Sequence, residues 1–388
     1  MMNSVKLAVN GGKPIRKTML PYSRQVVGED DIRLVSEALR GDLITRGPFV
    51  ERFEKEVAAF VEMPFGVAFS SATAALHAVM AMYKVTSKTK VITSPITFAA
   101  TANAVRYCDG EVEFRDIDMA TMNLRPNAET FKGAKIVVGV DFAGNPCRYD
   151  ELREIQKSQG WALVDDASHS LGGDYKKRKI GSQADVSIFS FHPVKSMTTG
   201  EGGLVVVKDL AQAEFLQQFR SHGITRNGCK LGYYEQEFLG FNYNITDLQC
   251  ALGISQLKKL PKFVERRNQI AEMYQERLSK IPHFILPAVT EGCRSAWHLY
   301  PLRIRFENLK ISRDEFLKAL HGENIGANVH YIPVYFHPYY KNLGYSRGLC
   351  PEAEKAYSQE VSIPNFASMT DEDVNDVCLA LDKLIAAC

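Results

Sequence analysis

The feature that most constrains the fold of this 388-residue chain is an alternation of short apolar runs and helix-like stretches over its first two thirds. Several apolar runs are nearly continuous in Val, Ile, Leu or Ala, as in strands buried on both faces of a parallel sheet. This alternation predicts an α/β fold with a mostly parallel sheet. Strands are predicted at residues 66–69, 90–93, 135–140, 161–164, 186–190 and 204–207, and helices at 29–39, 53–61 and 73–82.

The pattern changes after residue 248. Residues 256–278 predict one long amphipathic helix, rich in Lys, Arg, Glu and Gln, that could bridge two domains. An antiparallel strand is predicted at 296–306, followed by a helix at 313–321 and a further segment at 328–331. We therefore predict a large α/β domain over residues 1–255 and a smaller α+β domain, with its bridging helix, over residues 256–388. The N-terminal segment, residues 1–20, could pack on the smaller domain.

Charge and cysteine spacing exclude several classes of function. The chain has 47 basic and 45 acidic residues, and a net charge of +2 provides no basic field for nucleic acid. Its apolar runs are shorter than the ~18 residues of a membrane helix, and residues 1–17 lack the apolar segment of a signal peptide. The eight cysteines include no CxxC pair, which favours reduced thiols over a zinc or redox site. We expect a cytoplasmic protein without a metal site, a membrane contact or a nucleic-acid partner.

A lysine on a loop after a predicted strand is the strongest chemical signal. The segment Ser190-Phe-His-Pro-Val-Lys195 leaves the strand at 186–190 and leads into a glycine-rich turn that ends at Gly203. Desolvation lowers the pKa of a lysine amine and makes it a nucleophile that can form a Schiff base. The alternative for Lys195 alone is a solvated surface lysine.

An acid and a histidine follow the strand predicted at 161–164, in Val164-Asp165-Asp166-Ala-Ser-His169. A carboxylate at the end of a buried strand needs a cation or a strong donor as its partner. The protonated ring nitrogen of pyridoxal phosphate is such a partner, and the acid keeps the ring an electron sink. His169 could hydrogen-bond the phenolic oxygen of that cofactor or orient its ring. The alternatives are a helix cap for Asp166 and a structural role for His169.

The strands predicted at 66–69 and 90–93 are followed by residues that could bind a phosphate and an aromatic ring. The segment Phe69-Ser-Ser-Ala72-Thr73 predicts a strand, a turn and a helix whose first N–H groups can bind an anion. Phe98 follows the strand at 90–93 and a proline turn, and its ring could stack on a flat heteroaromatic ring. An ordinary capped helix and core packing are the alternatives.

Together these segments supply an amine nucleophile, an acid for a ring nitrogen, a phosphate cradle and a stacking face, the four parts of a pyridoxal phosphate site. All lie at the ends of predicted strands, and ligands of open α/β sheets bind at the carboxyl ends of strands. The joint pattern is more specific than any one member.

Segments 166–169, 190–195 and 198–203 resemble the cofactor motifs of the nucleotide-sugar aminotransferases of the DegT/DnrJ/EryC/StrS type, which are fold-type-I pyridoxal phosphate enzymes. The resemblance runs from Leu20-Pro-Tyr-Ser-Arg to Ser362-Ile-Pro. Within the family the chain is most similar to the pseudaminic-acid branch that makes UDP-4-amino-4,6-dideoxy-N-acetyl-β-L-altrosamine. The segments that carry this likeness are 93–98, 166–169, 190–195, 296–301 and 328–334.

The resemblance implies roles for the matching residues. Lys195 would bind pyridoxal 5′-phosphate as a Schiff base, Asp166 would pair with the ring nitrogen and His169 would lie near the ring oxygen. Phe98 would stack on the ring. The phosphate would be held by Ala72, Thr73 and Ser190, and by Asn242 of the neighbouring subunit in a homodimer with shared active sites.

Three residues, Tyr22, His330 and Tyr331, would line the sugar-nucleotide side, with loop or core packing as the alternative. The branch often carries arginine where this chain has Asn244, so the loop after Asn242 brings no such charge.

The implied reaction moves an amino group from L-glutamate, which leaves as 2-oxoglutarate, to C4 of a UDP-4-keto-6-deoxy-N-acetylhexosamine in a ping-pong cycle. The alternatives are another nucleotide-4-keto-sugar aminotransferase, or a sugar dehydratase, in some of which histidine replaces the lysine. A scaffold or sensor without activity is a third, and the intact acid–lysine pair argues against it. A nicotinamide dehydrogenase is excluded because no G-x-G-x-x-G follows a predicted strand.

Overall fold

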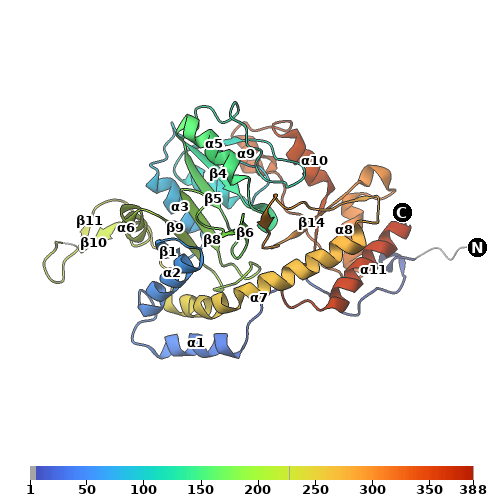
Figure 1. Cartoon of the computed structure of the whole chain (residues 1–388), viewed down its shortest axis with the longest axis horizontal. Helices are drawn as coiled ribbons and strands as arrows, with labels where there is room; N and C mark the ends of the chain where they lie inside the picture. Colours follow the sequence, from blue (N-terminus) through green and yellow to red (C-terminus); the bar gives the residue numbers. More distant parts are fainter. Residues whose placement is uncertain (1–5, 227, 388) are drawn as a thin grey trace, which may run out of the picture.

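A seven-stranded sheet forms the centre of the structure, a computed structural model that describes residues 6–226 and 228–387 (Figure 1). Its strand order is β1-β9-β8-β5-β4-β2-β3. The strands from β8 to β3 pair in parallel, whereas β9 is antiparallel to both of its neighbours. The strands are β1 (Phe65–Phe69), β2 (Lys90–Thr93), β3 (Glu111–Phe114), β4 (Ile136–Val140), β5 (Ala162–Asp166), β8 (Val186–Ser190) and β9 (Gly203–Val207).

Helices cover both faces of this sheet, as the apolar runs require. Five helices share one apolar core with one face: α3 (Ala72–Met82), α4 (Ala100–Tyr107), α6 (Leu210–Phe219), α9 (Pro338–Asn342) and α10 (Pro351–Gln359). The other face packs against α2 (Pro48–Phe60), α5 (Tyr149–Gln159) and the first half of α7 (Asp247–Leu278). Helix α1 (Glu29–Arg40) lies along α7, where the Asp31 carboxylate pairs with Lys259 at 2.8 Å.

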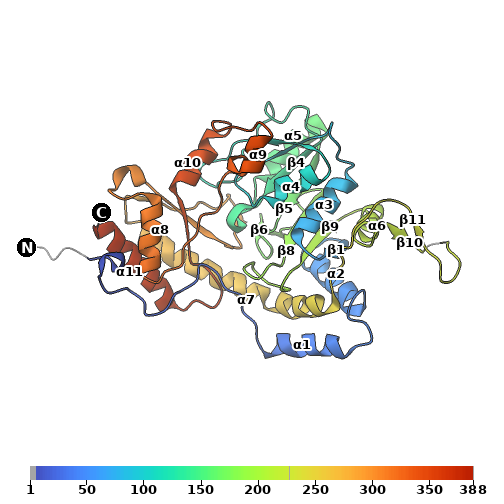
Figure 2. The ribbon, with the colours of Figure 1, turned by 180° about the vertical axis from the view of Figure 1, so that it is seen from behind.

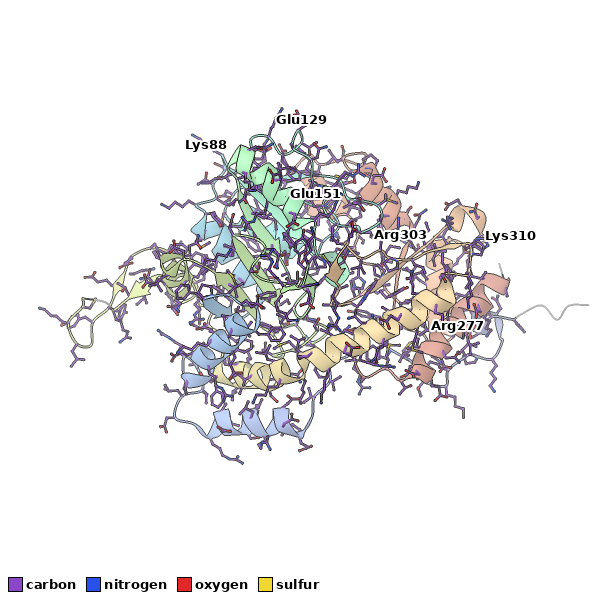
Figure 3. The ribbon with its side chains drawn as sticks, viewed as in Figure 1. Lys88, Glu129, Glu151, Arg277, Arg303 and Lys310 are labelled. Carbon is purple, nitrogen blue, oxygen red and sulfur yellow. The ribbon has the colours of Figure 1, made fainter. Side chains whose placement is uncertain are left out.

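Beyond α7 the chain builds a second, smaller sheet with its own core (Figure 2). The strands β12 (Phe284–Ile285), β14 (Tyr300–Ile304) and β15 (Glu360–Ile363) pair in that order and pack against α8 (Arg313–Gly322) and α11 (Asp371–Ala387). Leu7 and Leu20 from the N-terminal segment belong to the same core. Charged residues such as Lys88, Glu129 and Lys310 lie at the outer surface (Figure 3).

The remaining elements are short. Two small ribbons are formed by β13 (Cys293–Arg294), β6 (Asp174–Tyr175) and β7 (Arg178–Lys179), and by β10 (Ile224–Thr225) and β11 (Glu235–Gln236). Single 3-10 turns lie at Ala8–Asn10, Phe142–Gly144, Phe306–Asn308 and Val334–Phe336. Within the described residues, none of the helices combines the length and the apolar composition that would let it cross a membrane.

Two elements after residue 246 begin at other residues than the sequence predicts. Helix α7 begins at Asp247, before residue 256, because Thr246 and Gln249 form a capping box at its start. The strand predicted at 296–306 begins only at Tyr300, since the carbonyl groups of Trp297 and His298 accept hydrogen bonds from Arg267.

Residues 328–331 form a loop in which the N–H of His330 is bonded to the Glu360 carboxylate. The division into domains at residues 255 and 256 stays a prediction, and α7 runs across it. Residues from Val334 to Ala356 pack on the core of the large sheet although they follow the bridging helix.

Candidate active site

A cavity of about 860 Å³ opens at the carboxyl ends of the parallel strands, where ligands of open α/β sheets bind. It brings together residues from the N-terminal segment, from four loops of the large sheet and from the loop at 328–332. All the predicted site residues except Asn242 line it: Tyr22, Ala72, Thr73, Phe98, Asp166, His169, Ser190, Lys195, His330 and Tyr331.

Lys195 lies on the turn that follows β8, where its backbone N–H donates to the His192 carbonyl oxygen at 2.9 Å. Burial lowers the pKa of its ammonium to about 8, although the charge of Asp166 acts in the opposite direction. An amine with that pKa is partly neutral near pH 7–8, so it can act as a nucleophile and exchange protons. Lys195 is half-buried and lines the cavity, so it is not a solvated surface lysine.

Asp166 is the last residue of β5 and is buried at the cavity floor. Its Oδ2 accepts a 2.6 Å hydrogen bond from the Thr101 hydroxyl, and its Oδ1 accepts a weaker one from the Ser168 N–H. Within the described chain it forms no ion pair. Lys195 lines the same cavity but forms no ion pair with Asp166, so this buried carboxylate can take a cationic group of a ligand as its partner.

The side chain of Asp165, the neighbouring acid, lies on the other side of the sheet from the cavity. It accepts a 3.1 Å hydrogen bond from the Ser187 hydroxyl and lies beside Asp141, and it is absent from the cavity lining. Burial and the charge of Asp141 raise the pKa of the Asp165 carboxyl well above its usual range. Successive side chains of a strand point to opposite faces, so only one of the two acids can serve the cavity.

His169 is held by protein partners at both ring nitrogens. Its Nδ1 accepts from the Ala143 N–H at 3.3 Å, which leaves the proton on Nε2, 3.2 Å from the Tyr331 hydroxyl. Burial lowers the pKa of this imidazole well below its usual value, with further lowering from Lys195 and His330. A neutral His169 therefore presents a fixed ring in the cavity, and the ring of His298 lies 4.4 Å from it.

The start of α3 provides an anion site. Ser71 caps the helix by accepting from the Ala74 N–H at 3.1 Å, while the N–H groups of Ala72 and Thr73 precede the first helical acceptor and line the cavity. Strand β9 passes so close that a Cβ on Gly203 would lie 2.5 Å from the Ala72 nitrogen. Only glycine at position 203 leaves room for the start of α3 to pack against β9 in this way.

Phe98 lies on the exposed side of the cavity, close to Tyr331. The Phe98 ring is 61% exposed and 6.2 Å from the Tyr331 ring, so the alternative of core packing does not hold. Tyr22 lies 5.4 Å from the ring of His330. The Glu360 carboxyl group contacts this loop by accepting a hydrogen bond from the His330 N–H at 2.8 Å.

Asn242 is exposed and lies outside the cavity of its own chain. Its Oδ1 accepts from the Asn244 amide at 3.0 Å, and Asn244 in turn accepts from the Ser221 hydroxyl at 2.8 Å. The contribution of Asn242 to a neighbouring subunit stays a prediction.

These groups fit pyridoxal phosphate on the grounds of their own chemistry. An unpaired buried carboxylate suits a protonated ring nitrogen, free N–H groups at a helix start suit a phosphate, and a deprotonatable amine suits a Schiff base. Among the described residues, no group of three or more His, Cys, Asp or Glu side chains is arranged to hold a metal ion.

Comparison with known proteins decides the family. The DegT/DnrJ/EryC1/StrS aminotransferase family matches residues 25–382, almost the whole chain. The chain belongs to this aminotransferase family. The cofactor of the family is pyridoxal 5′-phosphate, so the predicted family, fold class and cofactor are confirmed.

Individual relatives cover most of the chain. It is 38% identical over 365 residues to a Campylobacter jejuni protein named UDP-4-amino-4,6-dideoxy-N-acetyl-beta-L-altrosamine transaminase, with 92% of this chain and 96% of that one covered. It is equally similar to the Bacillus subtilis spore coat polysaccharide biosynthesis protein SpsC, 38% over 383 residues, with 95% and 98% covered.

Solved structures of aminotransferases have the same fold over nearly the whole chain. Helicobacter pylori PseC, an aminotransferase involved in the biosynthesis of pseudoaminic acid, has a TM-score of 0.89 and 30% identity over 96% of this chain and 100% of that one. The PLP-form of the putative sugar aminotransferase Spr1654 from Streptococcus pneumoniae has a TM-score of 0.87 and 27% identity over 95% and 98%.

Several residues at the site were not predicted from the sequence, among them Thr101, His298 and Glu360. Thr101 lies one helical turn after Thr97, with the two hydroxyls 2.7 Å apart, and this spacing could have indicated a polar face toward Asp166. His298 lies in the strand predicted at 296–306, and that prediction gives no indication that the side chain lines the cavity. Glu360 carries no sequence signal, because its contact with His330 spans 30 residues.

Proposed function

We propose that this chain transfers the amino group of L-glutamate to C4 of a UDP-4-keto-6-deoxy-N-acetylhexosamine. The observation that carries the proposal is that the Lys195 amine, whose pKa burial lowers to about 8, and the buried carboxylate of Asp166 line the same cavity. The expected product is UDP-4-amino-4,6-dideoxy-N-acetyl-β-L-altrosamine, which rests on the likeness to the Campylobacter jejuni transaminase and to PseC. We also infer that the enzyme acts in the cytoplasm.

The residues of the cavity divide the work of holding the cofactor. When bound, pyridoxal phosphate supplies an electron sink for the carbon that bears the amino group. Asp166, fixed by the Thr101 hydroxyl, would hold the protonated ring nitrogen. The N–H groups of Ala72 and Thr73 and the hydroxyl of Ser190 would bind the phosphate. Phe98 would stack on the ring, and the fixed ring of His169 would orient it.

The Nζ of Lys195 would accept the proton that leaves the carbon bearing the amino group, and would return it later in the half-reaction. Its Nζ, with a pKa of about 8, is matched to accept and return a proton near neutral pH, as a general acid–base should. Burial also lowers the pKa of the His330 imidazole, to about 3, so that neither His330 nor His169 competes for this proton. The first half-reaction would end with release of 2-oxoglutarate, and the second would use Lys195 in the reverse sense on the sugar.

The sugar side of the cavity would be formed by Tyr22, His330 and Tyr331. Their phenol and imidazole groups can hydrogen-bond hydroxyl and N-acetyl groups of a sugar. The backbone N–H of His330 donates a hydrogen bond to Glu360 at 2.8 Å, which would help to hold this loop at the cavity.

A homodimer with shared active sites completes the proposal. Among the described residues that line the cavity, Lys195 is the only lysine or arginine, whereas a phosphate and a UDP diphosphate call for more donors. The hairpin formed by β10 and β11 projects from the molecule (Figures 1 and 2) and carries exposed side chains: Leu231, Tyr233, Tyr234 and Leu239. A second copy of the chain would cover this apolar surface and bring Asn242 to the phosphate.

The test is product analysis with a panel of UDP-4-keto-sugars and L-glutamate. We expect 2-oxoglutarate and a UDP-4-amino-4,6-dideoxy-N-acetylhexosamine, identified by mass, with the altro configuration established by NMR. Amino transfer only to a different nucleotide sugar would mean that the proposed substrate is wrong although the chain is an aminotransferase. Loss of water from the sugar without uptake of nitrogen would favour a dehydratase.

A further inference from the structure

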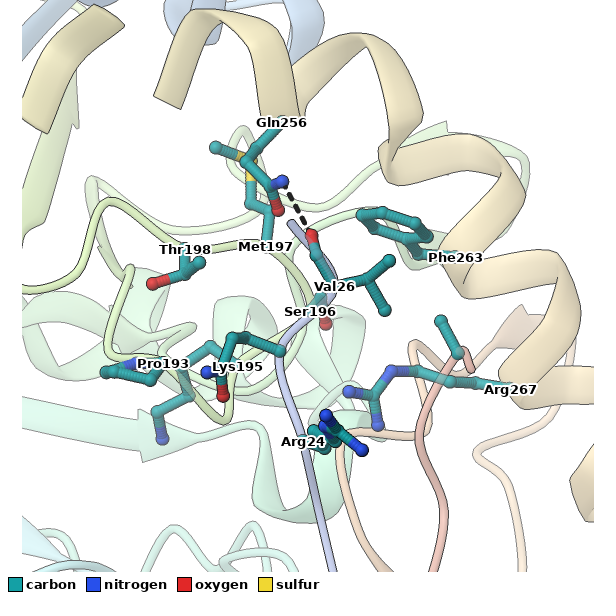
Figure 4. A pocket seen from close by; sticks show the side chains of 12 residues that line it. Arg24, Val26, Pro193, Lys195, Ser196, Met197, Thr198, Gln256, Phe263 and Arg267 are labelled. Carbon is teal, nitrogen blue, oxygen red and sulfur yellow. Dashed lines mark hydrogen bonds between the residues drawn. The ribbon is translucent and has the colours of Figure 1, made fainter. Parts of the chain in front are cut away.

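The cavity holds its two reactive side chains, Lys195 and Asp166, in different ways. Lys195 is placed by the fold of its turn. The Ser23 hydroxyl donates to the carbonyl oxygen of Val194 in that turn at 3.2 Å. Figure 4 shows the segment at residues 24–26 passing between this turn and helix α7. The carboxylate of Asp166 depends instead on two side-chain hydroxyl groups near the start of α4.

Two buried threonines form a hydrogen-bonded chain that ends at Asp166. The Thr101 hydroxyl lies 2.6 Å from Oδ2 of Asp166 and 2.7 Å from the Thr97 hydroxyl. An ionised carboxylate can only accept, so Thr101 donates its single hydroxyl proton to Asp166. Thr97 therefore donates to Thr101, and the chain runs in one direction, from Thr97 through Thr101 to the carboxylate.

The geometry of this chain leaves one carboxylate oxygen free for a ligand. A distance of 2.6 Å is that of an O–H group bonded to a charged oxygen, and the bond from Thr97 polarises the Thr101 hydroxyl and strengthens it. Oδ1 of Asp166 accepts only the longer bond from the Ser168 N–H, at 3.3 Å. Oδ1 is therefore the oxygen that can accept a strong hydrogen bond from a donor in the cavity.

The same turn carries the aromatic ring that is expected to stack on the cofactor. Phe98 directly follows Thr97, and its carbonyl oxygen accepts from the Thr101 N–H at 3.2 Å. All three residues line the cavity. One short segment thus fixes the stacking face and the support of the acid relative to each other.

We propose that Thr97 and Thr101 are positioning residues of the cofactor site, which fix the Asp166 carboxylate with Oδ1 turned toward the ring nitrogen. This rests on the assignment of Asp166 to that nitrogen in the proposed function. Both threonines act through Asp166. Without the Thr101 hydroxyl, the carboxylate would become ordered only when the cofactor binds, and the cost of that ordering weakens binding.

Cofactor affinity tests the proposal, measured by equilibrium dialysis of the full-length protein against pyridoxal phosphate. Thr101→Val keeps the shape of the side chain without the hydroxyl and should raise Kd about tenfold, the factor of one hydrogen bond to a charged group. Thr97→Val, one step further from the carboxylate, should raise Kd by about threefold. Thr101→Ser keeps the hydroxyl and should bind the cofactor as wild type does.

Thr93→Val is the matched control for the loss of a buried threonine hydroxyl. The Thr93 hydroxyl donates to the Val138 carbonyl oxygen at 3.2 Å, and Thr93 is absent from the cavity lining. Its replacement should leave the Kd of the cofactor unchanged.

A double-mutant cycle separates positioning from a general effect on the fold. Asp166→Asn should itself weaken cofactor binding, and Thr101→Val added to it should cause no further loss, since no charge remains to be fixed. A further loss of similar size in the double variant would overturn the proposal, because Thr101 would then act without Asp166. Wild-type affinity in Thr101→Val, together with weak binding in Asp166→Asn, would also overturn it and leave the proposed function intact. Wild-type affinity in Asp166→Asn would instead refute the assignment of Asp166 on which both rest.

Discussion

Replacing Glu360 with glutamine should make the stability of the folded protein less dependent on pH. Glu360 is the first residue of β15 and is fully buried. Burial raises the pKa of its carboxyl to about 8, although the hydrogen bonds from Ser362 and from the His330 N–H and the charge of Arg313 lower it. Folded protein at neutral pH therefore keeps this carboxyl mostly protonated.

The sign of the effect follows from the two pKa values. The ordinary value is 4.5, so the folded state binds this proton more tightly than the unfolded state does. The stabilisation is fully present below pH 4.5 and is lost as the pH rises through 8. With ~1.36 kcal/mol for each pKa unit, wild-type protein should lose ~4 kcal/mol of unfolding free energy between pH 5 and pH 9 through this group. Glu360→Gln does not titrate and should escape this loss.

Urea denaturation of both proteins at pH 5 and pH 9 measures the difference. Relative to wild type, Glu360→Gln should gain ~4 kcal/mol of unfolding free energy between the two pH values. Glu372→Gln, a change at an exposed acid, should follow wild type at both. Parallel pH dependence of wild type and Glu360→Gln would refute the reasoning, because it would mean that the buried carboxyl is already ionised at pH 5.

Two further predictions concern the cavity. Asp166→Asn should keep the fold and lower kcat by about 10²–10⁴-fold, since the partner of the ring nitrogen loses its charge. Asp165→Asn, on the other face of the strand, is the control, and a larger effect there would mean that the wrong acid has been assigned. Mixing Lys195→Ala with Asn242→Ala should restore part of the activity, because each heterodimer that forms has one site without either substitution. If subunits exchange and no activity returns, Asn242 serves its own subunit or no site at all.

The large sheet could be predicted from the sequence because its strands are buried on both faces. The continuous apolar run of β4, from Ile136 to Val140, is the pattern of a strand that is covered on both faces. Short edge elements such as β3, with its exposed Glu111 and half-buried Glu113, carry a weaker pattern and were not predicted. Tertiary contacts override local pattern at Trp297 and His298, whose carbonyl groups bond to Arg267 and so delay the start of β14.

The candidate site was predicted where each residue follows a strand or opens a helix. The carboxyl ends of parallel strands meet at one edge, so Asp166, Ser190 and Lys195 converge on the cavity although 29 residues separate the first from the last. Glu360 and His298 could not be found in this way. Their roles depend on how the second sheet packs against the first, which no local pattern encodes.

The most direct test of the central claim is borohydride reduction of the purified, yellow enzyme, followed by digestion and peptide mass analysis. We predict one reduced cofactor adduct, located on Lys195, and none in Lys195→Ala protein. An adduct on a different lysine, or an adduct that survives in Lys195→Ala, would contradict the assignment of Lys195 as the nucleophile of this site.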